Sequence, residues 1–264
     1  MDRRVLLAVA LAAVTLLAGC SWVAEDPTTP SSPSNSSDGP QDTGIPYERL
    51  DDHSAALANE SYDLGIDLEI RTPDRRRNAT VNVSSDPVGE RQLIRTESPN
   101  GSLDRYLAGQ ELYTRVNVNG TTEYNITDLG ARNVSFAAVH GSGIRVRRLA
   151  TIYEFGTFER AGNVTRDGER YAAFDLTEPA TGPNATVTLN DSSGRILIDQ
   201  NGIIRRATID LRGTQSGEPF VYAVDYRIER VGNVTIDEPA WFDEARSGAI
   251  STSRSENQTT SRSG

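Results

Sequence analysis

Side chains that commonly carry covalent or acid–base chemistry are scarce in this chain of 264 residues, which holds one cysteine, Cys20, and two histidines, His53 and His140. Two histidines without a second cysteine do not make up the usual ligand set of a zinc site. His140 precedes Gly141-Ser142-Gly143, which lacks the Gly-x-Ser-x-Gly pattern of a nucleophile elbow and predicts a turn before a helix. His53 follows Asp51-Asp52 and is expected on the solvated face of a helix. We therefore expect no catalytic residues, no metal site, no cofactor and no enzyme activity.

The single cysteine follows a short apolar segment. Arg3-Arg4 is a positive head, and residues 5–18 are an apolar core, shorter than the roughly 20 residues that a spanning helix needs. A charged head, an apolar core and small residues are the layout of a secretory signal. Leu17-Ala18-Gly19-Cys20 resembles the lipobox of bacterial and archaeal lipoproteins, in which a lipid alkylates the cysteine thiol and the chain is cut just before it. The resemblance implies that residues 1–19 are a lipoprotein signal peptide. It also implies that Cys20 is the lipid-attachment site, which anchors an exported protein to the outer face of the cell membrane.

Two alternatives stay open for this segment. An uncleaved anchor, or an ordinary signal with a chance cysteine, would have a similar composition. Arg3-Arg4 followed by Val5-Leu6-Leu7 also resembles a twin-arginine export signal, a route that carries folded proteins, although two arginines suit any ordinary signal head.

The charge balance indicates salt adaptation and excludes a nucleic-acid partner. The formal net charge is −10, and removing Asp2, Arg3 and Arg4 with the signal takes away +1, which gives −11. There is no lysine, so all 27 basic residues are arginine. An excess of Asp and Glu without lysine resembles the proteins of halophilic archaea, whose carboxylates keep the surface hydrated when salt screens repulsion; a merely acidic surface protein is the alternative. Binding to a phosphate backbone needs clustered basic residues, and Arg75-Arg76-Arg77 is expected to be a solvated turn.

Sequons for N-glycosylation recur along the chain, and their density predicts a glycoprotein that is modified at a subset of them. The sequon asparagines are Asn35, Asn59, Asn78, Asn82, Asn100, Asn119, Asn125, Asn133, Asn163, Asn184, Asn190, Asn233 and Asn257.

Composition divides the chain into four parts. Residues 20–46 are mostly Ser, Thr, Pro, Asp and Asn and are predicted to form a disordered, lipidated tether, because they offer little apolar surface to bury. The tether would reach on the order of 25–30 Å. Residues 247–264 are similar in composition and are predicted to form a disordered tail. Residues 47–246 between them are long enough for a single domain with a core of its own.

Alternation of apolar and polar residues predicts a sheet with one buried and one solvated face. The first run, residues 62–70, places Tyr62, Leu64, Ile66, Leu68 and Ile70 on one face. Similar runs occur at 81–83, 112–118, 187–189, 196–198, 203–211 and 220–228. Asn119-Gly120 and Asn201-Gly202 are typical of tight turns in hairpins.

Two other segments have helical spacing. Residues 46–58 predict a short opening helix, and residues 143–159 place Val146, Leu149, Ala150 and Tyr153 three or four residues apart. The second helix would divide the strands into an early group (62–126) and a late group (169–236). This pattern predicts an α+β fold, with helices covering one face of an antiparallel sheet.

Several segments together resemble the LolA/LppX superfamily over residues 47–246. They are "SYDLGIDLEI", "ELYTRVNVNGTTEYNI" and "RILIDQNGIIRRATIDL", and the closing "GNVTIDEPAWFDEA" is similar to a group of surface lipoproteins of salt-loving archaea of unknown function. The resemblance implies a strongly curved sheet, almost half a barrel, with helices covering the concave face. In better-known relatives the concavity holds lipid acyl chains or lipoprotein anchors.

The leading hypothesis is therefore a lipid-anchored exterior lipoprotein whose curved sheet binds a hydrophobic or amphiphilic ligand such as a lipid. The candidate ligand-binding residues are Leu64, Ile66, Leu68, Leu149, Tyr153, Tyr222, Val224 and Tyr226. A non-enzymatic surface interaction or structural module with a filled core is the alternative, and a capture subunit for a membrane-protein partner is a third hypothesis. A pocket between helix and sheet would favour the first of these, and full interdigitation would favour the second.

Overall fold

The computed structural model describes residues 48–180 and 187–247, which belong to one compact unit of the chain, residues 42–264. The predicted signal peptide, Cys20, the tether, residues 248–264 of the tail and the sequons at Asn35, Asn184 and Asn257 lie outside the described residues. What the sequence indicates for these segments stays a prediction.

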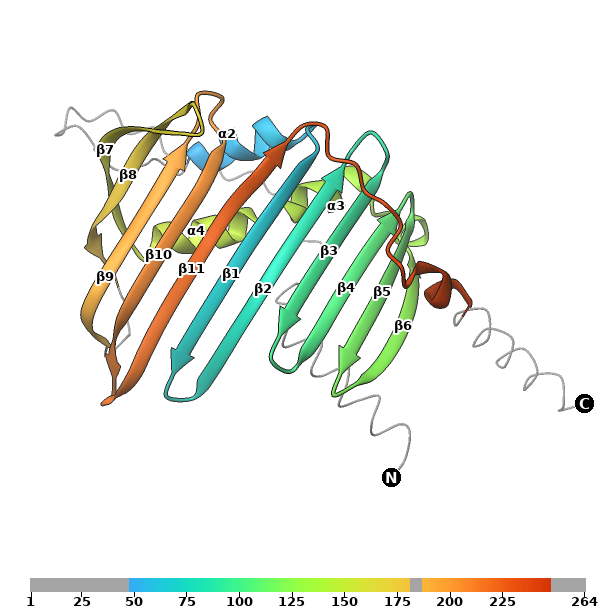
Figure 1. Ribbon diagram of the computed structural model, residues 1–264, viewed down its shortest axis with the longest axis horizontal. Helices are drawn as coiled ribbons and strands as arrows, with labels where there is room; N and C mark the ends of the chain where they lie inside the picture. Colours follow the sequence, from blue (N-terminus) through green and yellow to red (C-terminus); the bar gives the residue numbers. More distant parts are fainter. Residues whose placement is uncertain (1–47, 181–186, 248–264) are drawn as a thin grey trace, which may run out of the picture. The chain divides into compact units, whose positions relative to one another are not determined.

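Eleven antiparallel strands form a single open sheet (Figure 1). Their order is β6-β5-β4-β3-β2-β1-β11-β10-β9-β8-β7, so two meanders meet where β1 pairs with β11. The first meander contains β1 (Tyr62–Thr72), β2 (Arg75–Asp86), β3 (Arg91–Ser98), β4 (Gly101–Ala108), β5 (Glu111–Val118) and β6 (Thr121–Asp128). The second contains β7 (Gly156–Arg166), β8 (Glu169–Pro179), β9 (Val187–Ile198), β10 (Ile204–Gln215) and β11 (Glu218–Val231).

The register of the central strands follows the alternation in the sequence. Leu64, Ile66 and Leu68 of β1 lie opposite Ile228, Tyr226 and Val224 of β11. Directly opposite residues share a face, so these side chains form one continuous apolar surface. The turn between β5 and β6 uses Asn119 and Gly120, with φ of 52° and 78°, the positive angles that a type I′ hairpin requires.

Three α-helices lie on that apolar face (Figure 1). They are α2 (Glu48–Leu57), α3 (Phe136–Gly143) and α4 (Val146–Glu154), and a short 3-10 helix, η1 (Gly130–Arg132), follows β6. Ser135 caps α3 by accepting a hydrogen bond from the backbone N–H of Ala138 at 3.3 Å. Leu149 and Ile152 of α4 are fully buried in the main core cluster. The predicted α+β class, a curved antiparallel sheet covered by helices, is confirmed.

One boundary prediction was wrong. The helical spacing of residues 143–159 extends only to Glu154, because β7 begins at Gly156. A Cβ atom on Gly156 would come within 2.7 Å of the backbone oxygen of Glu178, so β7 and its neighbour β8 approach too closely there for a side chain. The late strand group therefore starts at residue 156 rather than 169.

The alternation predicted that the second face of the sheet is solvated, but part of this face is covered. Over β3 to β6 it carries Leu93, Tyr106 and Tyr113, which pack against Trp241 and Phe242 of the C-terminal segment. The rings of Phe242 and Tyr113 meet edge to face, with centroids 4.6 Å apart. This end of the sheet is therefore covered on its second face by residues 234–246.

Candidate functional site

The eight predicted ligand-binding residues meet in one core cluster between the helices and the sheet. Their exposed fractions run from 0% for Leu149 and Tyr226 to 8% for Leu68 and Tyr153. Side chains of α4 and of the central strands pack together there. Two of the eight residues, Leu68 and Val224, also line a hollow on the opposite face of the sheet, which is described below. A ligand contact by these eight residues stays a prediction.

His53 is part of this core and not of a solvated helix face, so that prediction was wrong. Its side chain is 0% exposed. Its Nδ1 accepts a hydrogen bond from the backbone N–H of Ile204 at 3.1 Å, which leaves Nε2 to donate to the Tyr226 hydroxyl at 2.9 Å. Tyr226 in turn donates to the carbonyl oxygen of Ile144 at 3.0 Å. Burial lowers the pKa of His53 to about 4. The neutral ring therefore connects α2 to β10 and β11 through two hydrogen bonds.

His140 has a similar role, and it lies inside α3 rather than in a turn before a helix. Its Nδ1 accepts a hydrogen bond from the Ser85 hydroxyl at 2.7 Å, and its Nε2 donates to the Leu57 carbonyl oxygen at 3.0 Å. The Tyr62 hydroxyl donates to the backbone oxygen of His140 at 2.8 Å. Both ring nitrogens therefore bind partners that hold α3 against β2 and the end of α2.

The apolar face of the sheet extends beyond the helices. Five hydrophobic side chains pack against the core but are only partly buried. They come from three strands and from the end of α4, and we call them the rim cluster: Ile70, Phe155, Leu176, Val187 and Leu189. The ring of Phe155, just after α4, stacks on Tyr222 with centroids 4.2 Å apart. Partly covered apolar side chains around a filled core are a surface on which another apolar group gains by packing.

Arginines border the rim cluster. Arg77 on β2 lies opposite Ile70, which lies opposite Tyr222 on β11, so the three side chains form one row on the helix-facing side. Burial and the charges of Arg75 and Arg148 lower the pKa of Arg77. The sequence predicted that Arg75-Arg76-Arg77 is a solvated turn, and this prediction was wrong. All three residues belong to β2, and Arg77 is half-buried.

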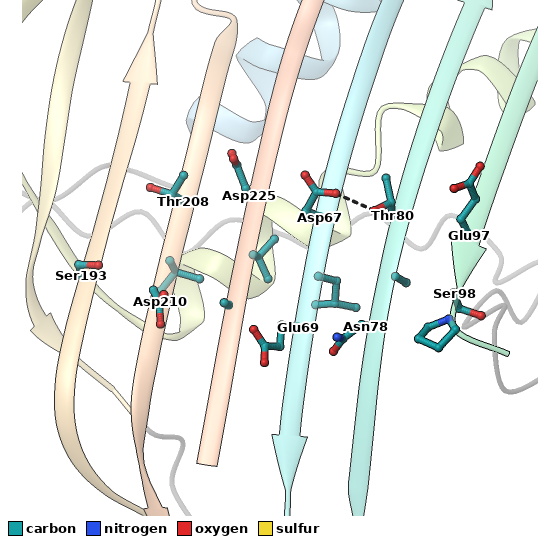
Figure 2. A pocket seen from close by; sticks show the side chains of 16 residues that line it. Asp67, Glu69, Asn78, Thr80, Glu97, Ser98, Ser193, Thr208, Asp210 and Asp225 are labelled. Carbon is teal, nitrogen blue, oxygen red and sulfur yellow. Dashed lines mark hydrogen bonds between the residues drawn. The ribbon is translucent and has the colours of Figure 1, made fainter. Parts of the chain in front are cut away.

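The other face carries a polar hollow of about 610 Å³ over strands β9 to β3 (Figure 2). Its labelled carboxylates are Asp67, Glu69, Glu97, Asp210 and Asp225. Most of their charge is already compensated by arginines on the same face: Arg227 contacts Asp67 at 2.6 Å, Arg206 contacts Asp225 at 2.8 Å, and Arg212 contacts Asp210 at 2.8 Å.

The state of Asp67 shows what this hollow can do. Burial raises its pKa, but hydrogen bonds from Arg227 and Thr80 outweigh burial, so the pKa lies below its ordinary value. A carboxylate with a lowered pKa is a weak base, so Asp67 is poorly matched to general acid–base catalysis near neutral pH. The hollow is a ladder of ion pairs that face solvent.

A second hollow, of about 330 Å³, lies between the C-terminal segment and strands β3 to β5. Arg115 spans it, pairing with Asp104 at 2.5 Å and lying 5.6 Å from the ring centroid of Trp241. Within residues 48–180 and 187–247, no three His, Cys, Asp or Glu side chains are placed to hold a metal ion. In the same residues, no helix has the length and the apolar composition of a membrane span.

Sequence reasoning did not identify Arg77 and Arg148 as neighbours of the rim cluster, although the residue pattern of β2 indicates which face Arg77 lies on. Arg77, Ala79, Val81 and Val83 have the same parity, and three of these four residues are apolar. Arg148 adjoins Leu149 in a helix whose buried stripe was recognised. Only the pairing of β2 with β1 and the packing of α4 bring the two arginines to one place.

Solved structures resemble the fold at low similarity. LprF from Mycobacterium bovis is 15% identical, with 74% of this chain and 96% of that chain covered and a TM-score of 0.35. The MucA/MucB complex of Pseudomonas aeruginosa gives 9% identity, 73% and 58% coverage and a TM-score of 0.31. A DUF1329 family protein from Desulfovibrio piger gives 9% identity, 74% and 95% coverage and a TM-score of 0.25. At these scores the likenesses carry no argument about function.

A match to a protein family is more extensive. The model of a family described as being of unknown function, DUF7537, matches residues 5–245. No curated protein matches the chain.

Proposed function

This chain belongs to the DUF7537 family, and we propose that it is a lipid-anchored exterior lipoprotein that binds a hydrophobic or amphiphilic ligand rather than an enzyme. The lipobox at Cys20 supports the anchor, and the acidic, lysine-free composition supports exposure to concentrated salt. The structural partners of His53 and His140 support a binding role over catalysis.

The observation that carries the proposal is the rim cluster. Ile70 and the other rim residues continue the buried surface of the sheet past the end of α4, where they are only partly covered. An alkyl chain laid along them would remove further apolar area from water, at about 25 cal/mol for each Å². The ligand would then contact the rim first. Apart from Tyr222, whose ring stacks on Phe155 at the edge of the rim cluster, it would reach the predicted residues only if α4 moved away from the sheet.

A pair of variants on β9 tests this proposal. Leu189 belongs to the rim cluster, whereas the adjacent Thr188 is exposed. We expect protein purified from its own membranes to carry lipid, detected by native mass spectrometry and by solvent extraction. Leu189→Asp should abolish this co-purification, because a charge at the rim excludes an alkyl chain, and Thr188→Asp should preserve it. Recovery of empty wild-type protein, or equal lipid content in both variants, would contradict the proposal.

The second candidate is the interaction module with a filled core, and the packing between α4 and the sheet favours it. Leu149, Ile152 and Tyr226 are 0% exposed, and the His53 and His140 hydrogen bonds hold the helices against the strands. Under this hypothesis, the exposed surfaces bind a membrane-protein partner within reach of the tether. Cross-linking in native membranes that captures one partner, together with an absence of bound lipid, would favour this candidate over the first.

A further inference from the structure

Two arginines and a tyrosine hydroxyl converge next to the rim cluster from three separate elements. Arg77 comes from β2, Arg148 from α4 and Tyr222 from β11. Arg77 and Tyr222 are separated by one strand, because both are register partners of Ile70. Strands lie about 4.8 Å apart, so the two backbones are about 10 Å apart and two long side chains can contact one small group between them.

The Tyr222 hydroxyl can donate its proton to a bound acceptor. Tyr222 is 6% exposed, and within the described part of the chain its hydroxyl donates to no acceptor. Burial raises the pKa of this hydroxyl, the charge of Arg148 and a hydrogen bond from its guanidinium lower it, and the charge of Glu154 raises it. A buried hydroxyl whose proton has no acceptor is destabilising, and a bound acceptor oxygen would remove that cost.

Arg77 lies near two other cations. Burial and the charges of Arg75 and Arg148 lower the pKa of Arg77. Glu154, exposed at the end of α4, is a carboxylate close enough to Tyr222 to act on its pKa. Like charges brought together in a partly buried place repel one another, and an anion placed between them turns the repulsion into attraction. Guanidinium groups suit a tetrahedral oxyanion best, because their N–H donors match two of its oxygens.

We propose that Arg77, Arg148 and the Tyr222 hydroxyl form a site for a phosphoryl or sulfo group. The proposal rests on the proposed function and deepens it, because the site lies where the alkyl chain of an amphiphile on the rim cluster would end. The ligand class is then an anionic amphiphile, with its head on the arginines and its chain along Ile70 and the neighbouring apolar side chains. A free phosphate or sulfate ion has the same head chemistry without the chain.

The experiment compares three probes on the full-length chain with Cys20→Ser, which removes the lipid anchor. The probes are dodecyl phosphate, dodecyl maltoside and inorganic phosphate, titrated by calorimetry at one fixed ionic strength. Each arginine has a matched neighbour on its own element: Arg76 on β2 and Arg147 on α4 are both exposed. Circular dichroism and thermal unfolding check that each variant is folded.

We expect dodecyl phosphate to bind more tightly than dodecyl maltoside. Arg77→Gln and Arg148→Gln should each weaken dodecyl phosphate by roughly ten- to hundredfold, the effect of one charged hydrogen-bonding partner. Tyr222→Phe should weaken it severalfold. Arg76→Gln and Arg147→Gln should leave its Kd within about twofold, because exposed charges are screened by salt.

The outcomes separate this inference from the proposed function. If both alkyl probes bind equally and Arg148→Gln changes neither, the anion site is wrong and the amphiphile surface stands. If inorganic phosphate binds as tightly as dodecyl phosphate and depends on Arg77 and Arg148, the anion site stands and the alkyl-binding function is wrong. Binding of no probe, or equal losses in the Arg76→Gln and Arg147→Gln controls, overturns the anion site.

Discussion

Acidification should destabilise the domain through His53, and the structure gives the size of the effect. Burial lowers the pKa of His53 from 6.5 to about 4. Protonation would add a hydrogen to Nδ1, so that this nitrogen could no longer accept the hydrogen bond from the backbone N–H of Ile204 at 3.1 Å. It would also bury an unpaired charge. The folded state therefore resists a proton that the unfolded chain accepts.

The sign and the magnitude follow from linkage. Between pH 6.5 and about 4, the unfolded chain binds more protons at this residue, so stability rises with pH across that window. The contribution is fully present above pH 6.5 and is lost as the pH falls to about 4. At 1.36 kcal/mol for each pKa unit, the loss is about 3 kcal/mol, a large part of the stability of an ordinary domain.

The assay is denaturant unfolding at constant high salt from pH 7.5 to pH 4.5, with the wild type compared with His53→Gln. The glutamine variant starts from a lower stability, but it cannot titrate in this window, so its curve should be flatter by about 2 to 3 kcal/mol over the range. Taking the difference removes the contribution of carboxylates common to both proteins. Parallel pH curves for the two proteins, or a His53 pKa near 6.5 by NMR, would refute the reasoning.

Three further predictions concern the anchor, salt and the C-terminal segment. Mass spectrometry of the native protein should find a chain that starts at Cys20 and carries lipid, and an intact Met1 start or a free thiol would contradict this. Cys20→Ser should release the protein or leave it unprocessed, since lipid burial contributes about 0.8 kcal/mol for each methylene. With a net charge of −11 after loss of the signal, the melting temperature should fall as salt is removed and the Debye length grows toward about 30 Å at 0.01 M, and a flat or rising melting temperature would count against salt adaptation. Phe242→Ala should lower the free energy of unfolding by about 3 kcal/mol, because the ring is 7% exposed between Tyr106 and Tyr113. Asp243→Ala, at the exposed neighbour, should lower it by less than about 0.5 kcal/mol, and equal losses would show that the segment does not stabilise this face.

Local patterns in the sequence predicted much of the sheet. The alternation on β1 and β11, the spacing of Leu149 and Tyr153 on α4 and the Asn119-Gly120 turn all depend on residues close together in the chain. Their geometry follows from a strand period of two and a helix period of 3.6. The α+β class therefore followed from the sequence before any tertiary contact was known.

Features that depend on distant pairing could not be predicted in this way. The burial of His53 needs Tyr226, 173 residues further along the chain, to supply its hydrogen-bond partner. The covered second face needs Phe242 to fold back on Tyr106 and Tyr113, although the alternation of β4 and β5 suggests only one buried face. Asp51 and Asp52 did mark a solvated part of α2, but the helix turns His53 to the opposite side.

The candidate site was predicted only in its apolar part. Tyr222 and the helix-facing residues of β1 follow from alternation, and the structure places them together. Arg77 was assigned to a turn because three consecutive arginines beside Pro73 and Asp74 resemble a polar loop. The pairing of β2 with β1 continues to Arg75, and this extension turns Arg77 toward Ile70.

The central claim is that an amphiphile binds on the helix-facing side of the sheet, at the rim cluster. The measurement that tests it most directly is NMR of the methyl-labelled protein with dodecyl phosphate, in which intermolecular nuclear Overhauser effects identify the contacted side chains. We expect contacts from the alkyl chain to the methyl groups of Ile70, Leu176 and Leu189, and none to Val88, which is 93% exposed. An absence of contacts at the rim, or equal contacts at Val88, would contradict the account.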